Sequence, residues 1–113
     1  MFDNLKNFAN LPGLMAKAKE MQEKVKQMQA EAGAKQVSAD SGGGMITAIV
    51  NGRLELVKLR IDKSRVDVND TEMLEDLVVA AVNAAQAKAA DMMRAEMARI
   101  ANDMGLPPGM PPQ

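Results

Sequence analysis

The chain has 113 residues, enough for one domain, and it contains no cysteine and no histidine. Disulfides, thiolate chemistry and most zinc sites are therefore excluded, and the usual general base at neutral pH is absent. We therefore expect a protein that is not an enzyme, with no catalytic residues, no metal site and no cofactor. No apolar run approaches the ~20 residues that span a membrane, so we expect a cytoplasmic protein without a membrane partner.

The net charge of −1 hides an uneven distribution along the chain. Residues 34–66 carry six Lys or Arg against three Asp or Glu, whereas residues 67–113 carry three against eight. The middle of the chain is therefore basic and its C-terminal part acidic, which matters for any polyanionic partner.

Residues 1–10 show no clean periodicity and predict a flexible lead-in. A long helix is expected from about Pro12, because apolar residues then recur at alternating steps of four and three. This apolar seam consists of Leu14, Ala18, Met21, Val25, Met28 and Ala32. A narrow seam with charged flanks is typical of a helix that packs along another helix. Gly33 is expected to end the helix as its C-terminal cap.

Three strands are expected next, over residues 35–41, 45–50 and 53–61. The first is polar and therefore suits an edge of the sheet. The three glycines at 42–44 precede a strand and lack a following Lys-Ser/Thr, so they favour a turn over a phosphate cradle.

Asn51-Gly52 predicts a two-residue hairpin turn in which both residues take positive φ. Such a turn would pair Ile49 with Leu54. The apolar phase of the third strand switches between Leu56 and Val57, which indicates either a bulge or burial of both faces of the strand.

The last helix is expected to begin near Asn69, Asp70 or Thr71, all good N-caps, and to end at Gly105. Its roughly 33 residues make it about 50 Å long, so part of it must project from a domain this small or pair with another chain.

The first half of this last helix is apolar nearly all round, as in a helix buried from two sides. The sheet can cover one side, and a second copy is the natural cover for the other. We expect that interface to use Leu74, Val78, Val79, Val82 and Asn83. Asn83 is expected to be a satisfied buried amide.

The Pro-rich segment 106–113 predicts a disordered tail. The domain itself is expected to span residues 11–105 as an α+β fold. Its elements follow the order α-β-β-β-α, with a three-stranded antiparallel sheet and two long helices.

The basic side chains allow two interpretations, a solvated face or a nucleic-acid surface. The chain has two Phe and no Tyr or Trp, so it lacks a platform for stacking single-stranded bases. A nucleic-acid partner would therefore be a duplex, bound through its phosphates. From charge placement alone, the candidate contacts are Lys17, Lys19, Lys24, Lys26, Arg53, Lys58, Arg60, Arg94 and Arg99.

Several segments resemble the YbaB/EbfC family of bacterial nucleoid-associated proteins. They are Gly43-Gly44 before the second strand, the Asn51-Gly52 hairpin, Ile61-Asp62 after the third strand, the stretch 72–85 and the segment 15–22. The resemblance covers residues 11–104. It implies a tweezer-shaped homodimer, located in the nucleoid, that binds DNA with little sequence preference and affects nucleoid organisation or gene expression.

The sequence thus favours a homodimer that binds duplex DNA without catalysis. A dimeric scaffold or adaptor, which grips a protein partner with its helical tips, is the alternative. The acidic C-terminal third favours that alternative, because it would repel phosphate.

Overall fold

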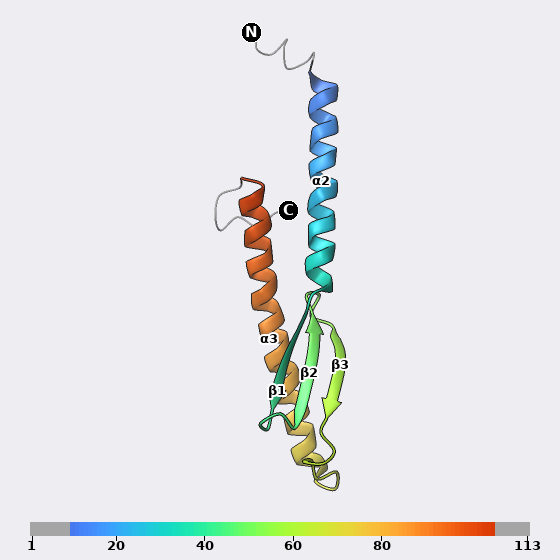
Figure 1. The fold of residues 1–113 in the computed structure, drawn as a ribbon, viewed down its shortest axis with the longest axis vertical. Helices are drawn as coiled ribbons and strands as arrows, with labels where there is room; N and C mark the ends of the chain where they lie inside the picture. The colour runs from blue at the N-terminus through green and yellow to red at the C-terminus, as the bar shows by residue number, and fades with distance from the viewer. Residues whose placement is uncertain (1–9, 106–113) are drawn as a thin grey trace.

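The computed structural model describes residues 10–105 (Figure 1). Its elements are α2 (Leu11–Ala34), β1 (Gln36–Ser41), β2 (Ile46–Asn51), β3 (Leu56–Ile61) and α3 (Thr71–Asp103). The predicted α-β-β-β-α order and the two long helices are confirmed. The predicted flexible lead-in and the predicted disordered tail lie outside the described residues, apart from Asn10.

The three strands form one antiparallel sheet in the order β1-β2-β3. β1 is therefore an edge strand, as its polar sequence predicted. The turn between β1 and β2 contains Gly42, Gly43 and Gly44 at φ of 60°, 65° and 97°. Residues with a Cβ rarely adopt these values, so the glycines serve the turn, as expected.

The hairpin between β2 and β3 is not the predicted two-residue turn. The Asn51 amide donates to the Glu55 carbonyl at 3.0 Å, which leaves three residues in the loop. The positive φ lies at Leu54 (64°), not at Asn51 or Gly52. The Asn51 side-chain oxygen accepts from the amides of Arg53 (2.9 Å) and Glu55 (3.1 Å) and holds the loop in this longer form.

The longer loop changes the strand register, so the predicted pairing of Ile49 with Leu54 is wrong. Ile49 instead lies opposite Lys58, and Val50 lies opposite Leu56. Val57 is left over between these pairs as a bulge, which was one of the two predicted causes of the phase switch.

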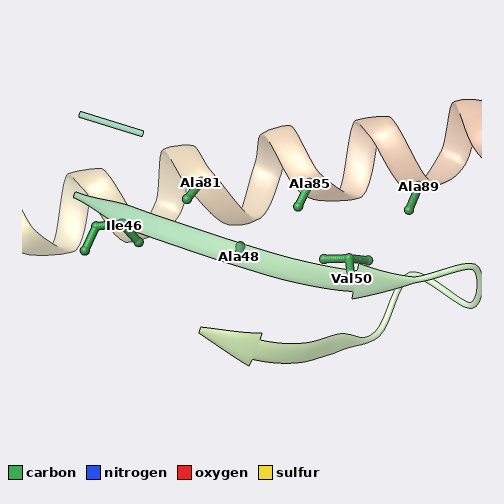
Figure 2. Packing of buried hydrophobic residues seen from close by; sticks show 6 residues of the cluster. All are labelled: Ile46, Ala48, Val50, Ala81, Ala85 and Ala89. Carbon is green, nitrogen blue, oxygen red and sulfur yellow. The ribbon is translucent and has the colours of Figure 1, made fainter. Parts of the chain in front are cut away.

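The core lies between the sheet and α3. Ile46, Ala48 and Val50 of β2 are fully buried against the small residues Ala81, Ala85 and Ala89 of α3. Figure 2 shows the alanines along the helix face turned toward β2. Small residues at every fourth position let the helix backbone approach the sheet closely, and the larger β2 side chains fill the space.

Both ends of α3 match the sequence prediction. Asp70 is the N-cap, and its side chain accepts from the Met73 amide at 3.2 Å. The helix ends before Gly105, which has a φ of 74°. Gly33, by contrast, is not a cap, because α2 continues through Ala34 and Gly33 is buried within it.

Gly33 and Gly52 form a close joint between α2 and the β2–β3 hairpin. The Gly52 amide donates to the Gly33 carbonyl at 3.0 Å. A Cβ at residue 52 would lie 2.4 Å from the Ala32 carbonyl oxygen and 2.6 Å from the Met93 sulfur. Gly52 therefore allows α2, α3 and the hairpin to meet at one point.

The described molecule is elongated, with extents of 79 × 21 × 17 Å. In Figure 1 the first half of α2 extends beyond the end of α3. The apolar seam of α2 is consequently covered only toward the sheet: Ala32 is buried, whereas Leu14 and Met21 are 50% and 43% exposed. Within one chain, α2 therefore packs along another helix, as predicted, only through its C-terminal part.

Candidate nucleic-acid interface

The first group of predicted cations lies on the projecting part of α2. Lys17 and Lys24 are seven residues apart and share one flank of the apolar seam, and Lys19 and Lys26 share the other. All four are exposed, and none forms an ion pair with another described residue. α2 therefore presents two parallel rows of cations on a rigid support.

The second group lies on the face of the sheet opposite α3. Arg60 is paired with Thr47 and Lys58 with Ile49, and these positions alternate with the β2 residues buried under α3. Lys58 and Arg60 therefore point away from the helix. Both are exposed, and within residues 10–105 neither contacts a carboxylate.

The bulge at Val57 produces this separation of charge. It shifts the register of β3 by one residue, so that Leu59 and Ile61 lie opposite the buried Ala48 and Ile46 on the α3 side and the two cations fall on the other. We call the face that carries Lys58 and Arg60 the open face of the sheet.

The two groups are separate in space. Lys17 precedes the end of α2 by 17 residues, so it lies about 25 Å along the helix from the sheet at 1.5 Å per residue. The fold thus places the sequence-predicted cations on two surfaces and does not gather them into one site.

The three other predicted cations are neutralised by carboxylates. Arg53 contacts Glu55 at 2.8 Å, and Arg94 contacts Asp91 at 3.0 Å. Hydrogen bonds from Arg53 and Asn51 lower the pKa of Glu55, which keeps its charge opposite Arg53. Paired arginines attract phosphate less than free cations do, so these positions are weaker candidates.

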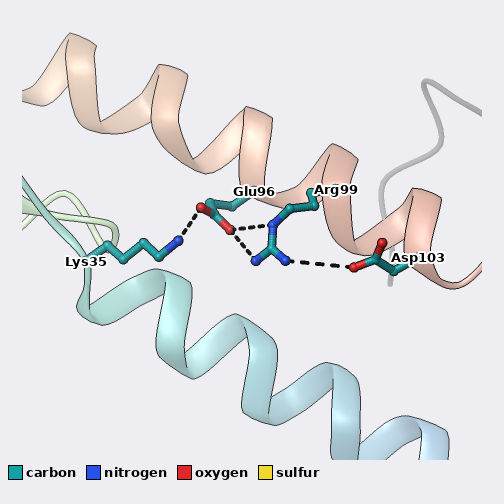
Figure 3. Close-up of polar contacts among 4 residues, drawn as sticks. All are labelled: Lys35, Glu96, Arg99 and Asp103. Carbon is teal, nitrogen blue, oxygen red and sulfur yellow. Dashed lines mark hydrogen bonds and ion pairs between the residues drawn. The ribbon is translucent and has the colours of Figure 1, made fainter.

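Arg99 belongs to a network that joins α2 and α3 (Figure 3). Glu96 accepts from Lys35, at the junction of α2 and β1, and from Arg99 at 2.7 Å. Arg99 also lies 3.8 Å from Asp103. Hydrogen bonds from Lys35 and then Arg99 lower the pKa of Glu96, and Glu96 in turn raises the pKa of Arg99. Lys35 makes the contact that crosses to α3, and Arg99 pairs within α3 and holds the Glu96 carboxylate that Lys35 reaches, a role that the sequence did not indicate.

The end of the molecule at the start of α3 is acidic. A shallow hollow there is lined by Asp70, Glu72 and Asp76, together with Met73 and Leu77. This end would repel a polyanion, as the charge count of the C-terminal third predicted.

The predicted interface residues of α3 do not share one environment. Leu74, Val78 and Val82 pack partly against the core of their own chain. Val79 is 58% exposed, and Asn83 is exposed as well. Asn83 is therefore not buried within one chain, and its burial at an interface stays a prediction. Of the five residues, only Val79 and Asn83 are exposed.

Within residues 10–105, no three His, Cys, Asp or Glu side chains gather closely enough to hold a metal ion. No helix in this described part of the chain is both long enough and apolar enough to cross a membrane.

Comparison with known proteins identifies the family. Residues 6–104 match the sequence profile of the YbaB/EbfC DNA-binding family. The chain belongs to that family. This match confirms the family resemblance that the sequence showed. The predicted α-β-β-β-α fold is confirmed as well.

Similar proteins are found in several bacteria. A nucleoid-associated protein of Thermoanaerobacter pseudethanolicus is 46% identical over 98 residues, which cover 87% of this chain and 88% of the relative. One from Paramagnetospirillum magneticum is 47% identical over 100 residues, covering 88% and 94%. The crystal structure of an uncharacterized Helicobacter pylori protein superposes with a TM-score of 0.55 at 25% identity, covering 77% of this chain and 96% of that one.

Proposed function

We propose that this protein binds duplex DNA as a homodimer, without catalysis and with little sequence specificity, and that it acts on nucleoid organisation or gene expression. Membership of a DNA-binding family and the nucleoid-associated relatives support DNA as the partner and the bacterial nucleoid as the location.

The observation that carries the proposal is that six of the predicted contact cations are exposed and have no carboxylate partner among the described residues. They are Lys17, Lys19, Lys24 and Lys26 on α2, and Lys58 and Arg60 on the open face. Lysine and arginine on rigid elements can contact phosphates of any sequence. A homodimer doubles each group, which raises the local positive potential at both surfaces.

Low specificity follows from the composition of these surfaces. Duplex sequence is read through bidentate contacts of Arg, Asn or Gln with base edges. Five of these six predicted contacts are lysines, which act as point charges. We therefore infer that phosphate contacts supply most of the affinity.

The test is the salt dependence of duplex binding by the pure protein. Each phosphate contact releases counterions, so log K should fall against log salt by about 0.9 per contact on duplexes of unrelated sequence. Similar affinities and slopes for all duplexes, together with weaker binding to single strands, are expected. Binding that does not change between ~50 and ~200 mM salt would refute a phosphate-driven mode.

One observation favours the alternative function, a scaffold or adaptor that grips a protein partner. The projecting half of α2 exposes the large apolar residues Leu11 (45%), Leu14 (50%) and Met21 (43%) between its lysine rows. Such a seam could accept a helix of a protein partner. If the pure protein fails the salt test, this adaptor function replaces the DNA-binding one.

A further inference from the structure

The packing face of α3 changes its residue type just past the end of β2. Along β2 this face consists of Ala81, Ala85 and Ala89, which are fully buried (Figure 2). The next residue of the same row, four positions on, is Met93, and it lies beside Gly52 of the hairpin. A flexible methionine thus fills the irregular space in which α3, the hairpin and the end of α2 meet.

The distances place the Met93 sulfur inside the joint of Gly33 and Gly52. The sulfur lies 2.6 Å from the point where a Cβ on residue 52 would stand. The Ala32 carbonyl oxygen and the Gly33 Cα lie 2.4 Å and 2.9 Å from the same point. These neighbours are backbone atoms, which cannot swing aside as a side chain can.

Met93 differs in its surroundings from the methionines on the surface. Met15, Met21 and Met73 are 64%, 43% and 48% exposed, so an atom added to their sulfur enters solvent. Met93 is half-buried, so a small solute can reach it, but an atom added to its sulfur enters the joint. The chain has no cysteine, so its thioethers are the only sulfur groups that an oxidant can modify.

We infer that Met93 is an oxidation site, at which a peroxide converts the thioether to a sulfoxide that weakens the joint between α2 and the hairpin. A lone pair of the sulfur attacks one peroxide oxygen, and an S–O bond forms as the O–O bond breaks. The proton of the transferred hydroxyl passes to the departing hydroxide, which leaves as water. The sulfur is oxidised and the peroxide is reduced, so no further reactant is needed.

The product is poorly suited to the joint. Oxidation turns a flexible apolar side chain into a polar one. The Gly52 amide, the backbone donor of the joint, already donates to the Gly33 carbonyl at 3.0 Å. The sulfoxide oxygen either competes for this amide or stays without a donor, and both arrangements cost stability.

A weakened joint would let α2 move relative to the sheet. The lysine rows of α2 would then lose their fixed position relative to the cations of the open face. This consequence for DNA rests on the proposed function. The oxidation site itself does not, and its test uses the protein without DNA.

The experiment treats the wild type, Met93→Leu and Met73→Leu with hydrogen peroxide and follows peptide mass and melting temperature over time. Leucine keeps the size and apolarity of Met93 without its sulfur, and Met73→Leu is the matched control at an exposed methionine of the same helix. The wild type and the control should lose several degrees as Met93 gains the mass of one oxygen atom. Met93→Leu should keep its melting temperature, although its surface methionines become oxidised to the same extent.

Hydrogen exchange of the Gly52 amide reads the joint in the wild type alone, whatever the stability of the variants. This amide should exchange about tenfold faster or more in protein oxidised at Met93. Exchange should return to its original rate when methionine sulfoxide reductases, one for each epimer, restore the thioether.

Three results would overturn the inference. In the first, Met93 stays unmodified while the surface methionines are fully oxidised. In the second, Met93→Leu loses as much melting temperature as the wild type. In the third, the Gly52 amide exchanges at an unchanged rate in protein fully oxidised at Met93. Duplex binding is measured separately, so a wild type that does not bind DNA refutes the proposed function and leaves the oxidation site standing.

Discussion

At the scale of single residues, the hairpin at Asn51-Gly52 shows what a local pattern can and cannot predict. The pair correctly marks where the chain reverses. Its usual turn is wrong here, because the Asn51 side chain binds two loop amides and Leu54 takes the positive φ. Gly52 is needed for a different reason, the close approach of α2 and α3, and no pattern within the hairpin reveals that contact.

Gly52→Ala should therefore destabilise the fold. Its Cβ would lie 2.4 Å from a backbone oxygen that cannot move without shifting α2. Overpacking of this kind costs about 1–3 kcal/mol, so the melting temperature should fall by several degrees. Gly13→Ala is the control, since its nearest contact is an ordinary 3.7 Å and alanine favours a helix. If the Gly52 variant and the wild type have equal melting temperatures, the joint between α2 and the hairpin accommodates a Cβ at residue 52.

At the scale of elements, the sequence predicted what depends on local chemistry. Short-range patterns predicted an N-cap among residues 69–71, the end of α3 at Gly105 and, as one of two alternatives, a bulge where the phase of the third strand switches. The structure confirms the helix end and selects Asp70 as the N-cap and the bulge at Val57. The Lys35–Glu96–Arg99 network could not be predicted, because its members come from the end of α2 and the second half of α3. Only the packed helices bring them together.

Glu96→Gln should remove a contribution of this network to stability that depends on pH. The pKa of Glu96 is lowered in the folded chain below its ordinary 4.5, chiefly by Lys35. The stabilisation is therefore fully present above the unfolded pKa and is lost as pH falls through the folded value. The melting temperature of the variant should lie below that of the wild type at about pH 6, and the gap should close toward about pH 3. Glu23→Gln, an exposed site on α2, should show no such gap; a gap that stays constant with pH would argue against the network.

At the scale of the whole molecule, the arrangement of the layers could not be predicted. Nothing in the pattern of α3 says that it covers β1 and β2 and leaves the inner face of β3 bare. The pattern likewise could not show that α2 would project and separate its lysines from the cations of the sheet. The first feature depends on where the axis of α3 crosses the sheet, which is set by the alanines at 81, 85 and 89.

Paired charge reversals test whether the exposed cations of α2 and of the open face bind the phosphates of duplex DNA. Lys58→Glu with Arg60→Glu removes the open-face group, and Lys17→Glu with Lys24→Glu removes one row of α2. At about 100 mM salt, at least one pair should weaken binding to unrelated duplexes tenfold or more and flatten the salt slope by about 0.9 per lost contact. Arg94→Glu, at a cation already paired with Asp91, should have a smaller effect per substitution. Unchanged affinity and slope in both double variants would rule out this mode of DNA binding, because the two cationic surfaces would then be ordinary solvated faces.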